Sequence, residues 1–260
     1  MNKEINISEI EEKIIVNNNP FPNVLINNLL PIDIVKKAES EFIAFKKTVN
    51  AGCKPFQKTK RLFEDYEMMP PTIQEIIKFF NSKSFINVLE KKFNLKNIKP
   101  DWTLHGGGLH ESFNGGFLKV HSDFIYMRKS KLKRVLNLLI YLNSNWDAKW
   151  GGAIEFWDKK MSSAQASISP EINNAAIFRT DKNSNHGFPD PIKCPDDITR
   201  KSIALYYYVE EKSFFPITLK RTKYFHAVWK RRPNIEEPRF ADDHKSLFKK
   251  MKLRFFYRFF

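Results

Sequence analysis

Residues 104–123 read LHGGGLHESFNGGFLKVHSD, and the last three of them, His121, Ser122 and Asp123, form a His-x-Asp motif. Side chains alternate along an extended segment, so the imidazole of His121 and the carboxylate of Asp123 point to the same side. One imidazole nitrogen and one carboxylate oxygen suit a divalent metal such as Fe(II), and a second histidine would complete a facial triad with open coordination positions. The motif therefore predicts part of a metal site.

The candidate for the second imidazole is His186, in TDKNSNHGFPDP. A strongly β-type run, TRKSIALYYYV, follows and carries Arg200 and Ser202 two residues apart. These two side chains share one face of a strand, while Lys201 points the other way. The planar fork of an arginine matches a carboxylate. The order of His-x-Asp, His and Arg-x-Ser thus predicts a metal centre beside an acid-binding arginine.

Size and composition are those of a globular chain that forms one large domain, or one domain with an additional segment. Its 260 residues are 42% hydrophobic and 28% charged. No run of about 18 apolar residues suggests a membrane span, and the opening MNKEINISEIEEKI lacks the features of a signal peptide. Cys53 and Cys194 are expected to be reduced thiols. We expect a cytoplasmic protein.

The net charge of +15 is concentrated near the C-terminus. From Lys220 to Phe260 there are 13 Lys and Arg against 4 Asp and Glu, a net +9. Such a segment is compatible with nucleic acid, an anionic membrane surface or an acidic substrate. A solvated helix whose long side chains cover apolar surface is the favoured interpretation, because phenylalanines are interspersed among the charges.

Periodicity predicts helices first and strands later. We expect a short helix within residues 1–19, a strand over Asn23–Ile26, a helix opening at Pro31, a loop over 50–62 and one helix from Pro71 to Phe93. From Ile98 onward short β-rich runs are separated by Gly, Asn, Asp or Pro, which is typical of a sandwich or jelly roll. Residues 159–170 are predicted to be a connection. Further strands are expected in SFFPITLK and YFHAVWK, followed by a basic helix over Ala241–Phe256.

Five ordered blocks carry a resemblance to a known family: NPFPNVLINNLLP, GGFLKVHSD, RVLNLLIYLN, WDAKWGGAIEFWD and HGFPDPIKCPDDITRKSIALYYYVEE. Over residues 20–230 the chain resembles the Fe(II)- and 2-oxoglutarate-dependent dioxygenases, within them the prolyl 4-hydroxylase-like branch. The resemblance implies an α+β fold whose mainly β core is a double-stranded β-helix, a jelly roll. We expect a helical support segment over residues 1–95, the catalytic core over 96–212, and a basic, aromatic extension over 213–260.

The resemblance also implies roles for individual residues. His121, Asp123 and His186 would be the iron ligands, and Arg200, assisted by Ser202, would bind the distal carboxylate of 2-oxoglutarate. Tyr141 matches a tyrosine that contacts the same carboxylate, and Asn137, on the same strand face, is a weaker candidate for lining the site. With O2 and 2-oxoglutarate, such an enzyme hydroxylates an unactivated C–H bond and releases succinate and CO2. Because a carboxylate, Asp123, occupies the position where halogenating relatives seat a halide, hydroxylation is favoured.

The substrate stays open at the level of sequence. The resemblance implies a peptidyl proline, with ascorbate dependence, but a small molecule, a sugar or a nucleic acid is an alternative. A base demethylase is disfavoured because Tyr206 stands where those relatives carry a second arginine. A zinc site from His105, His110 and His121, a nucleic-acid-binding module and a catalytically inactive β-helix are further alternatives. Substrate choice is expected to lie in residues 104–116 and 159–170 and in the C-terminal extension, and the oligomeric state is unknown.

Overall fold

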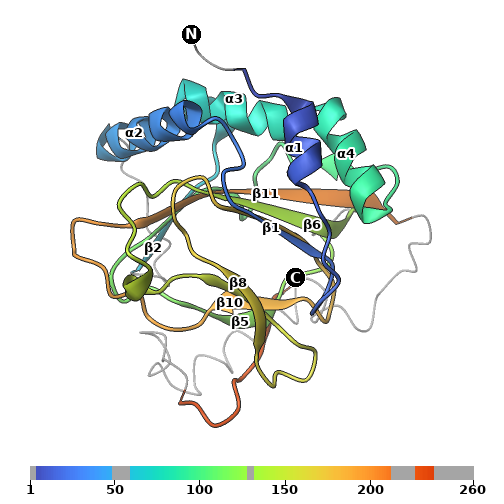
Figure 1. Cartoon of the computed structure of the whole chain (residues 1–260), viewed down its shortest axis with the longest axis vertical. Helices are drawn as coiled ribbons and strands as arrows, with labels where there is room; N and C mark the ends of the chain where they lie inside the picture. The colour runs from blue at the N-terminus through green and yellow to red at the C-terminus, as the bar shows by residue number, and fades with distance from the viewer. Residues whose placement is uncertain (1–3, 49–58, 128–131, 212–225, 237–260) are drawn as a thin grey trace, which may run out of the picture.

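The computed structural model describes residues 4–48, 59–127, 132–211 and 226–236. Figure 1 shows three layers, with the helices on one side, a larger sheet in the middle and a smaller sheet below it. Among the described residues, no helix combines the length and the apolar character needed to cross a membrane.

The helices form the outer layer over the larger sheet (Figure 1). The described α-helices are α1 (Ile7–Lys13), α2 (Ile32–Thr48), α3 (Pro71–Phe80) and α4 (Lys83–Phe93), with short 3-10 turns at η1 (Tyr66–Met68) and η2 (Ala148–Trp150).

Both sheets are built from antiparallel pairs. Within the described residues, the larger sheet has the order β1-β9-β6-β11-β4-β2 with β3 beside β11, and the smaller sheet has the order β12-β5-β10-β7-β8. The larger sheet comprises β1 (Asn23–Ile26), β2 (Lys60–Phe63), β3 (Lys99–Pro100), β4 (Gly108–Ser112), β6 (Leu132–Tyr141), β9 (Ala175–Arg179) and β11 (Arg200–Glu210). The smaller sheet comprises β5 (Leu118–Ser122), β7 (Ile154–Trp157), β8 (Ala164–Ile168), β10 (Asn185–Phe188) and β12 (Val228–Trp229). This pair of sheets, with helices on one side, confirms the predicted α+β class and its double-stranded β-helix core.

Strand alternation in β6 and β11 separates a packing face from a functional face. Ile140 and Ile203 belong to the main hydrophobic cluster under the helices, whereas Arg200 and Ser202 line a cavity between the sheets. The two strands are the longest in the larger sheet and pair directly, with Ser202 opposite Tyr141. The two strands therefore carry cavity-lining residues on one face and residues of the main hydrophobic cluster on the other.

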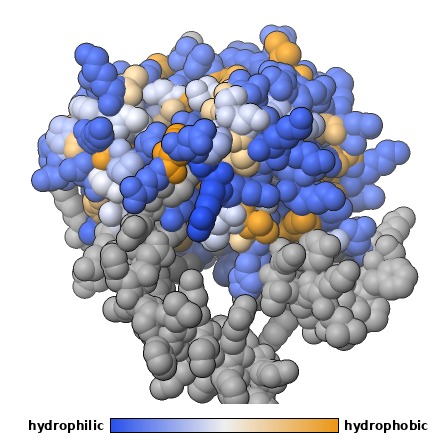
Figure 2. Space-filling model, turned by 90° about the horizontal axis from the view of Figure 1, so that it is seen from below, coloured by the Kyte–Doolittle hydropathy of each residue, from blue (hydrophilic) through white to orange (hydrophobic). Residues whose placement is uncertain are grey.

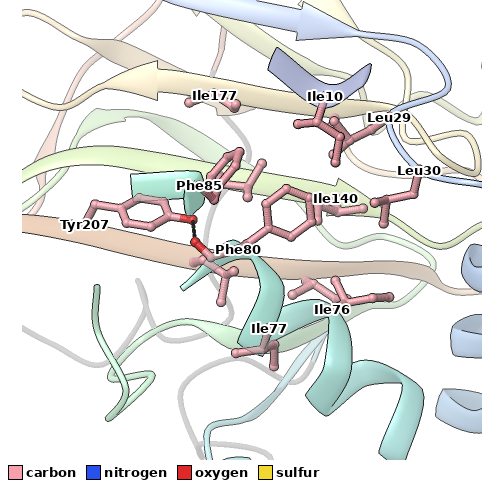
Figure 3. Packing of buried hydrophobic residues seen from close by; sticks show 14 of the residues in the cluster. Ile10, Leu29, Leu30, Ile76, Ile77, Phe80, Phe85, Ile140, Ile177 and Tyr207 are labelled. Carbon is pink, nitrogen blue, oxygen red and sulfur yellow. Dashed lines mark hydrogen bonds between the residues drawn. The ribbon is translucent and has the colours of Figure 1, made fainter. Parts of the chain in front are cut away.

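The main hydrophobic cluster joins the helices to the larger sheet, as Figure 3 shows. Phe80 and Phe85 pack edge to face with ring centroids 4.7 Å apart. Tyr207 enters the same cluster from β11, and its hydroxyl donates a hydrogen bond of 3.0 Å to the carbonyl of Phe80 (Figure 3). That bond satisfies a carbonyl at the end of α3 that has no partner within the helix.

Several sequence predictions are corrected by the structure. The helix expected over Pro71–Phe93 is two helices, because Asn81 ends α3 and the side chain of Ser82 caps α4 by accepting a hydrogen bond from the amide of Phe85. The expected connection 159–170 contains β8, which is mostly exposed and has only one large apolar residue, Ile168, so its sequence does not show a strand pattern. The expected loop 50–62 ends in β2, while the predicted strand over Asn23–Ile26 is confirmed.

The C-terminal predictions are only partly covered by the described residues. The segment YFHAVWK contributes β12, which pairs with β5. The strand expected in SFFPITLK and the basic helix over Ala241–Phe256 lie outside the described residues. The division into 1–95, 96–212 and 213–260 stays a proposal, and the first segment supplies β1 and β2 to the larger sheet as well as helices.

Candidate active site

Three potential metal ligands converge on the inner face of the smaller sheet. His121 from β5 and His186 from β10 stand opposite each other in the strand register, and Asp123 follows the end of β5. Ligand atoms of the three side chains all lie within 4.8 Å of one another. The Nε2 atoms of His121 and His186 lie 3.4 Å and 3.5 Å from the carboxylate oxygens of Asp123. Two imidazoles and one carboxylate are the donor set of a facial Fe(II) site.

The backbone orients both imidazole rings in the same way. Nδ1 of His121 lies 2.9 Å from the carbonyl oxygen of Lys119, and Nδ1 of His186 lies 2.9 Å from that of Ser184. A carbonyl oxygen only accepts, so each Nδ1 carries the proton and donates. In the neutral form of each ring, Nε2 then carries the lone pair that a metal ligand needs, and this atom faces Asp123.

The electrostatics keep His186 and Asp123 in their metal-binding protonation states. Burial lowers the pKa of His186 to about 4, although Asp123 opposes the shift, so its ring is neutral at neutral pH. Burial by itself would raise the pKa of Asp123. The guanidinium of Arg134 opposes that effect, and the pKa of this carboxyl is held well below its usual range.

Asp123 is held by a buried polar pair from β6. Nδ2 of Asn137 donates a hydrogen bond of 2.8 Å to Oδ2 of Asp123, and Nη2 of Arg134 lies 3.4 Å from the same oxygen. Nε of Arg134 donates to Oδ1 of Asn137 at 2.7 Å. The guanidinium carbon lies 3.3 Å from the ring centroid of Tyr206, so Arg134 is fixed by stacking as well as by charge.

The other end of the cavity is dominated by Arg200. Its Nε donates to the carbonyl of Gly152 at 2.8 Å, and its Nη2 donates to the hydroxyl of Tyr141 at 3.1 Å. The side chain is 5% exposed, and no carboxylate of the described residues lies within 4 Å of its guanidinium. Burial lowers the pKa of Arg200, only partly offset by Tyr141. A buried cation without an acidic partner is costly, and a carboxylate ligand would supply that partner.

One cavity of about 190 Å³ joins the two ends. It is lined by His121, Asp123 and His186 at one end, by Arg200 and Ser202 at the other, and by Asn137, Leu139, Ile154, Phe178, Phe188 and Tyr206 between them, among other residues. The structure thus brings together all three proposed metal ligands and the proposed acid-binding pair Arg200 and Ser202. Tyr141 is fully buried behind Arg200.

Some expected residues behave differently from the sequence expectation. Asn137 lines the cavity, but its side chain bonds to Asp123 and Arg134, away from Arg200. Lys201 does point away from the cavity, where its Nζ lies 3.7 Å from Glu39. The zinc alternative gains no support within the described residues, because Nε2 of His110 bonds to the carbonyl of Gly106 and His110 is absent from the ligand cluster.

Three neighbours of the site escaped the sequence reasoning. Arg134 was missed because a bulge interrupts β6: Tyr207 pairs with Leu136 but Tyr208 pairs with Arg134. The extra residue, Val135, turns Arg134 onto the same face as Asn137. The second is Trp229 on β12, whose ring centroid lies 4.9 Å from the ring centroid of His121. The third is Gly152, whose backbone carbonyl accepts a hydrogen bond from Nε of Arg200.

Comparisons with known proteins agree with this geometry. Residues 107–208 match the family model of the 2OG-Fe(II) oxygenase superfamily. A solved prolyl 4-hydroxylase from Phytophthora capsici aligns with a TM-score of 0.55 at 15% identity, over 82% of this chain and 68% of that chain. A prolyl 4-hydroxylase from Pseudomonas putida aligns with a TM-score of 0.53 at 10% identity, over 80% of this chain and 100% of that chain. Identities this low show a shared fold. No curated protein matches the sequence.

Proposed function

We propose that this chain hydroxylates an unactivated C–H bond of peptidyl proline. Its residues 107–208 match the family model of the 2OG-Fe(II) oxygenase superfamily. The co-products would be succinate and CO2. The observation that carries the proposal is a single cavity with a His-Asp-His cluster at one end and a buried, carboxylate-free arginine at the other.

His121, Asp123 and His186 would hold the iron, because their donor atoms already face one another. Iron bound there would supply electrons for the activation of O2 and so the redox chemistry of C–H hydroxylation. The chain itself presents a neutral imidazole at His186 and an ionised carboxylate at Asp123, so no proton has to be removed from these two residues before the metal binds.

Arg200 would anchor the distal carboxylate of 2-oxoglutarate. Its guanidinium already donates one hydrogen bond to the carbonyl of Gly152 and one to the hydroxyl of Tyr141, and these two bonds fix the plane of the guanidinium. Ser202 lines the same end of the cavity and is 1% exposed. A buried charge pair formed there would be strong because the surroundings are apolar.

The cavity walls would exclude water from the reacting centre. Apolar side chains line it, among them Leu139, Ile154, Phe178 and Phe188. The ring centroid of Phe178 lies 4.6 Å from the ring centroid of His186. A dry, shaped cavity strengthens the electrostatic contacts within it and limits side reactions. Peptidyl proline as the substrate is supported by likeness in fold to prolyl 4-hydroxylases. Ascorbate as a reductant is part of the same proposal.

The test has two parts that separate the chemistry from the substrate. Purified protein with Fe(II) and 2-oxoglutarate is expected to form succinate, and Asp123→Ala and Arg200→Met are expected to abolish it. Lys149→Gln, at an exposed position of η2, is the control and should leave succinate formation unchanged. Mass spectrometry of proline-containing peptides should then detect the gain of one oxygen atom. Absence of succinate would refute the oxygenase chemistry, and succinate without any oxidised peptide would refute the substrate.

A further inference from the structure

We propose that a lysine-lined pocket beside the metal cluster receives the substrate, and that the substrate is a proline-containing peptide with acidic side chains near the target residue. This inference rests on the proposed hydroxylase function and names the substrate class of that same site.

The pocket shares a wall with the metal cluster. It has a volume of about 420 Å³ and is lined by Ser122, Asp123, Ile125, Lys159, Lys182, Asn183, Val228 and Lys230. Asp123 also lines the cavity that contains His121, His186 and Arg200. A group seated in this pocket therefore lies next to the carboxylate that would bind the iron, on a side that Arg200 does not occupy.

Three lysines from three separate parts of the chain give the pocket its charge. Lys159 lies between β7 and β8, Lys182 lies between β9 and β10, and Lys230 follows β12. Within the described residues, no carboxylate lies within 4 Å of any of the three ammonium groups. The acid in the pocket wall, Asp123, is already engaged by Arg134 and Asn137. The three ammonium groups therefore give the pocket a positive charge that an anionic ligand would complement.

The two turns that carry Lys159 and Lys182 are held in place by their own aspartates. Oδ1 of Asp158 accepts the amide of Ser162 at 2.6 Å, and Oδ1 of Asp181 accepts the amide of Asn183 at 2.6 Å. These are local side-chain to backbone bonds that stabilise turns. Both aspartates are used to shape the turns, and the lysines next to them are presented on preformed backbone.

The backbone segments that carry Lys159 and Lys230 are also held by packing and by hydrogen bonds. Met161, Trp157 and Val120 form a small buried cluster that fixes the turn of Lys159 on β5. The amide of Lys230 donates to the carbonyl of Val120 at 2.8 Å, and Arg232 pairs with Asp190 at 2.8 Å. A preformed site loses less entropy when its ligand binds.

The chemistry of the wall favours an acidic peptide over single-stranded nucleic acid. Ile125 and Val228 offer apolar surface, and Ser122 and Asn183 can bond to a peptide backbone. No aromatic side chain is among the described lining residues, whereas single-stranded nucleic acid is usually held by stacking on aromatic rings. On the smaller-sheet side of the molecule, Figure 2 shows mostly hydrophilic described residues with small, separate hydrophobic groups, which suits a charge-directed ligand.

The experiment compares three matched peptides for binding to the metal-free protein by isothermal titration calorimetry. Each peptide has one proline, flanked by glutamates, by glutamines or by lysines. Because an exposed ion pair contributes about 0.2–1 kcal/mol, or about 1.5- to 5-fold in affinity, two or three such pairs should favour the glutamate peptide about tenfold over the glutamine peptide. The preference should shrink as ionic strength rises.

Variants assign the effect to this pocket. Lys159→Gln combined with Lys182→Gln should remove most of the preference for the glutamate peptide, while Lys78→Gln, an exposed position of α3 on the opposite side of the larger sheet, should keep it. Equal affinity for the three peptides, or an unchanged preference in the double variant, would overturn the proposal. The proposal would also be overturned by competition with a single-stranded oligonucleotide. In that outcome, the oligonucleotide displaces bound glutamate peptide at a lower concentration than unlabelled glutamate peptide needs.

The outcome is separable from the hydroxylase proposal. Succinate formation from 2-oxoglutarate and Fe(II) without any peptide tests the oxygenase chemistry alone. Charge-dependent peptide binding in a protein that forms no succinate would refute the oxygenase. Succinate formation without charge-dependent binding would refute the acidic substrate.

Discussion

Replacing Arg134 with methionine should weaken metal binding without touching a proposed ligand. Arg134 lies 3.4 Å from Oδ2 of Asp123 and also fixes Asn137, which donates to the same oxygen. Methionine keeps much of the side-chain length and removes both contacts. Groups that orient metal ligands typically contribute 10- to 100-fold to metal affinity, so we expect a loss of about 1.4–2.7 kcal/mol in binding free energy.

An opposing effect acts on the same variant. The positive charge of Arg134 repels a cation bound at Asp123, and its removal alone would strengthen binding. We expect loss of orientation to dominate, because Asp123 would lose its ion pair and Asn137 would lose the partner of its carbonyl oxygen. Arg134→Lys keeps the charge but cannot reproduce the fork, so its affinity should be intermediate.

The assay is calorimetric titration of the metal-free protein with Mn(II), supported by the visible spectrum of the Co(II) form. Lys133→Met is the matched control, since Lys133 neighbours Arg134 on β6 but pairs with Glu211 at 3.6 Å. Thermal unfolding of each variant shows whether the fold is intact. Unchanged or tighter Mn(II) binding in a folded Arg134→Met protein would refute the positioning role.

Three other predictions follow from single contacts. Gly152→Ala places a Cβ atom 3.2 Å from Cδ of Arg200 at a φ of +77°, whereas Gly151→Ala has the same φ with no atom within 4 Å. Both should lose about 1–3 kcal/mol of stability, but calorimetry should show weaker 2-oxoglutarate binding only for Gly152→Ala, and equal binding would contradict our assignment of Arg200. Tyr207→Phe removes the buried bond to Phe80 and should cost about 1–3 kcal/mol in urea unfolding, while Tyr208→Phe, whose buried hydroxyl has no partner in the described residues, should cost less. Because the pKa of His186 falls from 6.5 to about 4 on folding, the metal-free protein should lose up to about 3 kcal/mol of stability as the pH falls from about 6.5 to about 4; a His186→Gln variant with the same pH dependence would exclude this origin.

Alternation along strands made much of the cavity predictable. Arg200 and Ser202 are two residues apart on β11 and both line the cavity, while Lys201 between them reaches Glu39 on the other face. The same rule placed His121 and Asp123 on one side. These predictions needed only a regular strand and a correct register.

Where the backbone departs from regularity, the sequence was not sufficient. Alternation from Asn137 would place Arg134 under the helices with Leu136, and only the bulge at Val135 turns it into the cavity. Edge strand β8 is mostly exposed and consists of small or polar residues apart from Ile168, so it lacks the pattern of large apolar side chains that marks a buried strand. The break between α3 and α4 depends on a serine cap within an otherwise continuous helical pattern.

The hydrogen bonds of His121 and His186 to carbonyls two residues earlier have a consequence for assembly of the site. Each ring is aimed by its own strand, so neither histidine depends on the other for its direction. Their meeting depends on the pairing of β5 with β10, in which His186 stands opposite His121. A slip of one residue between these strands would send one imidazole to the outer surface. Tight binding of a divalent ion would thus be a direct readout that the smaller sheet has closed in its native alignment.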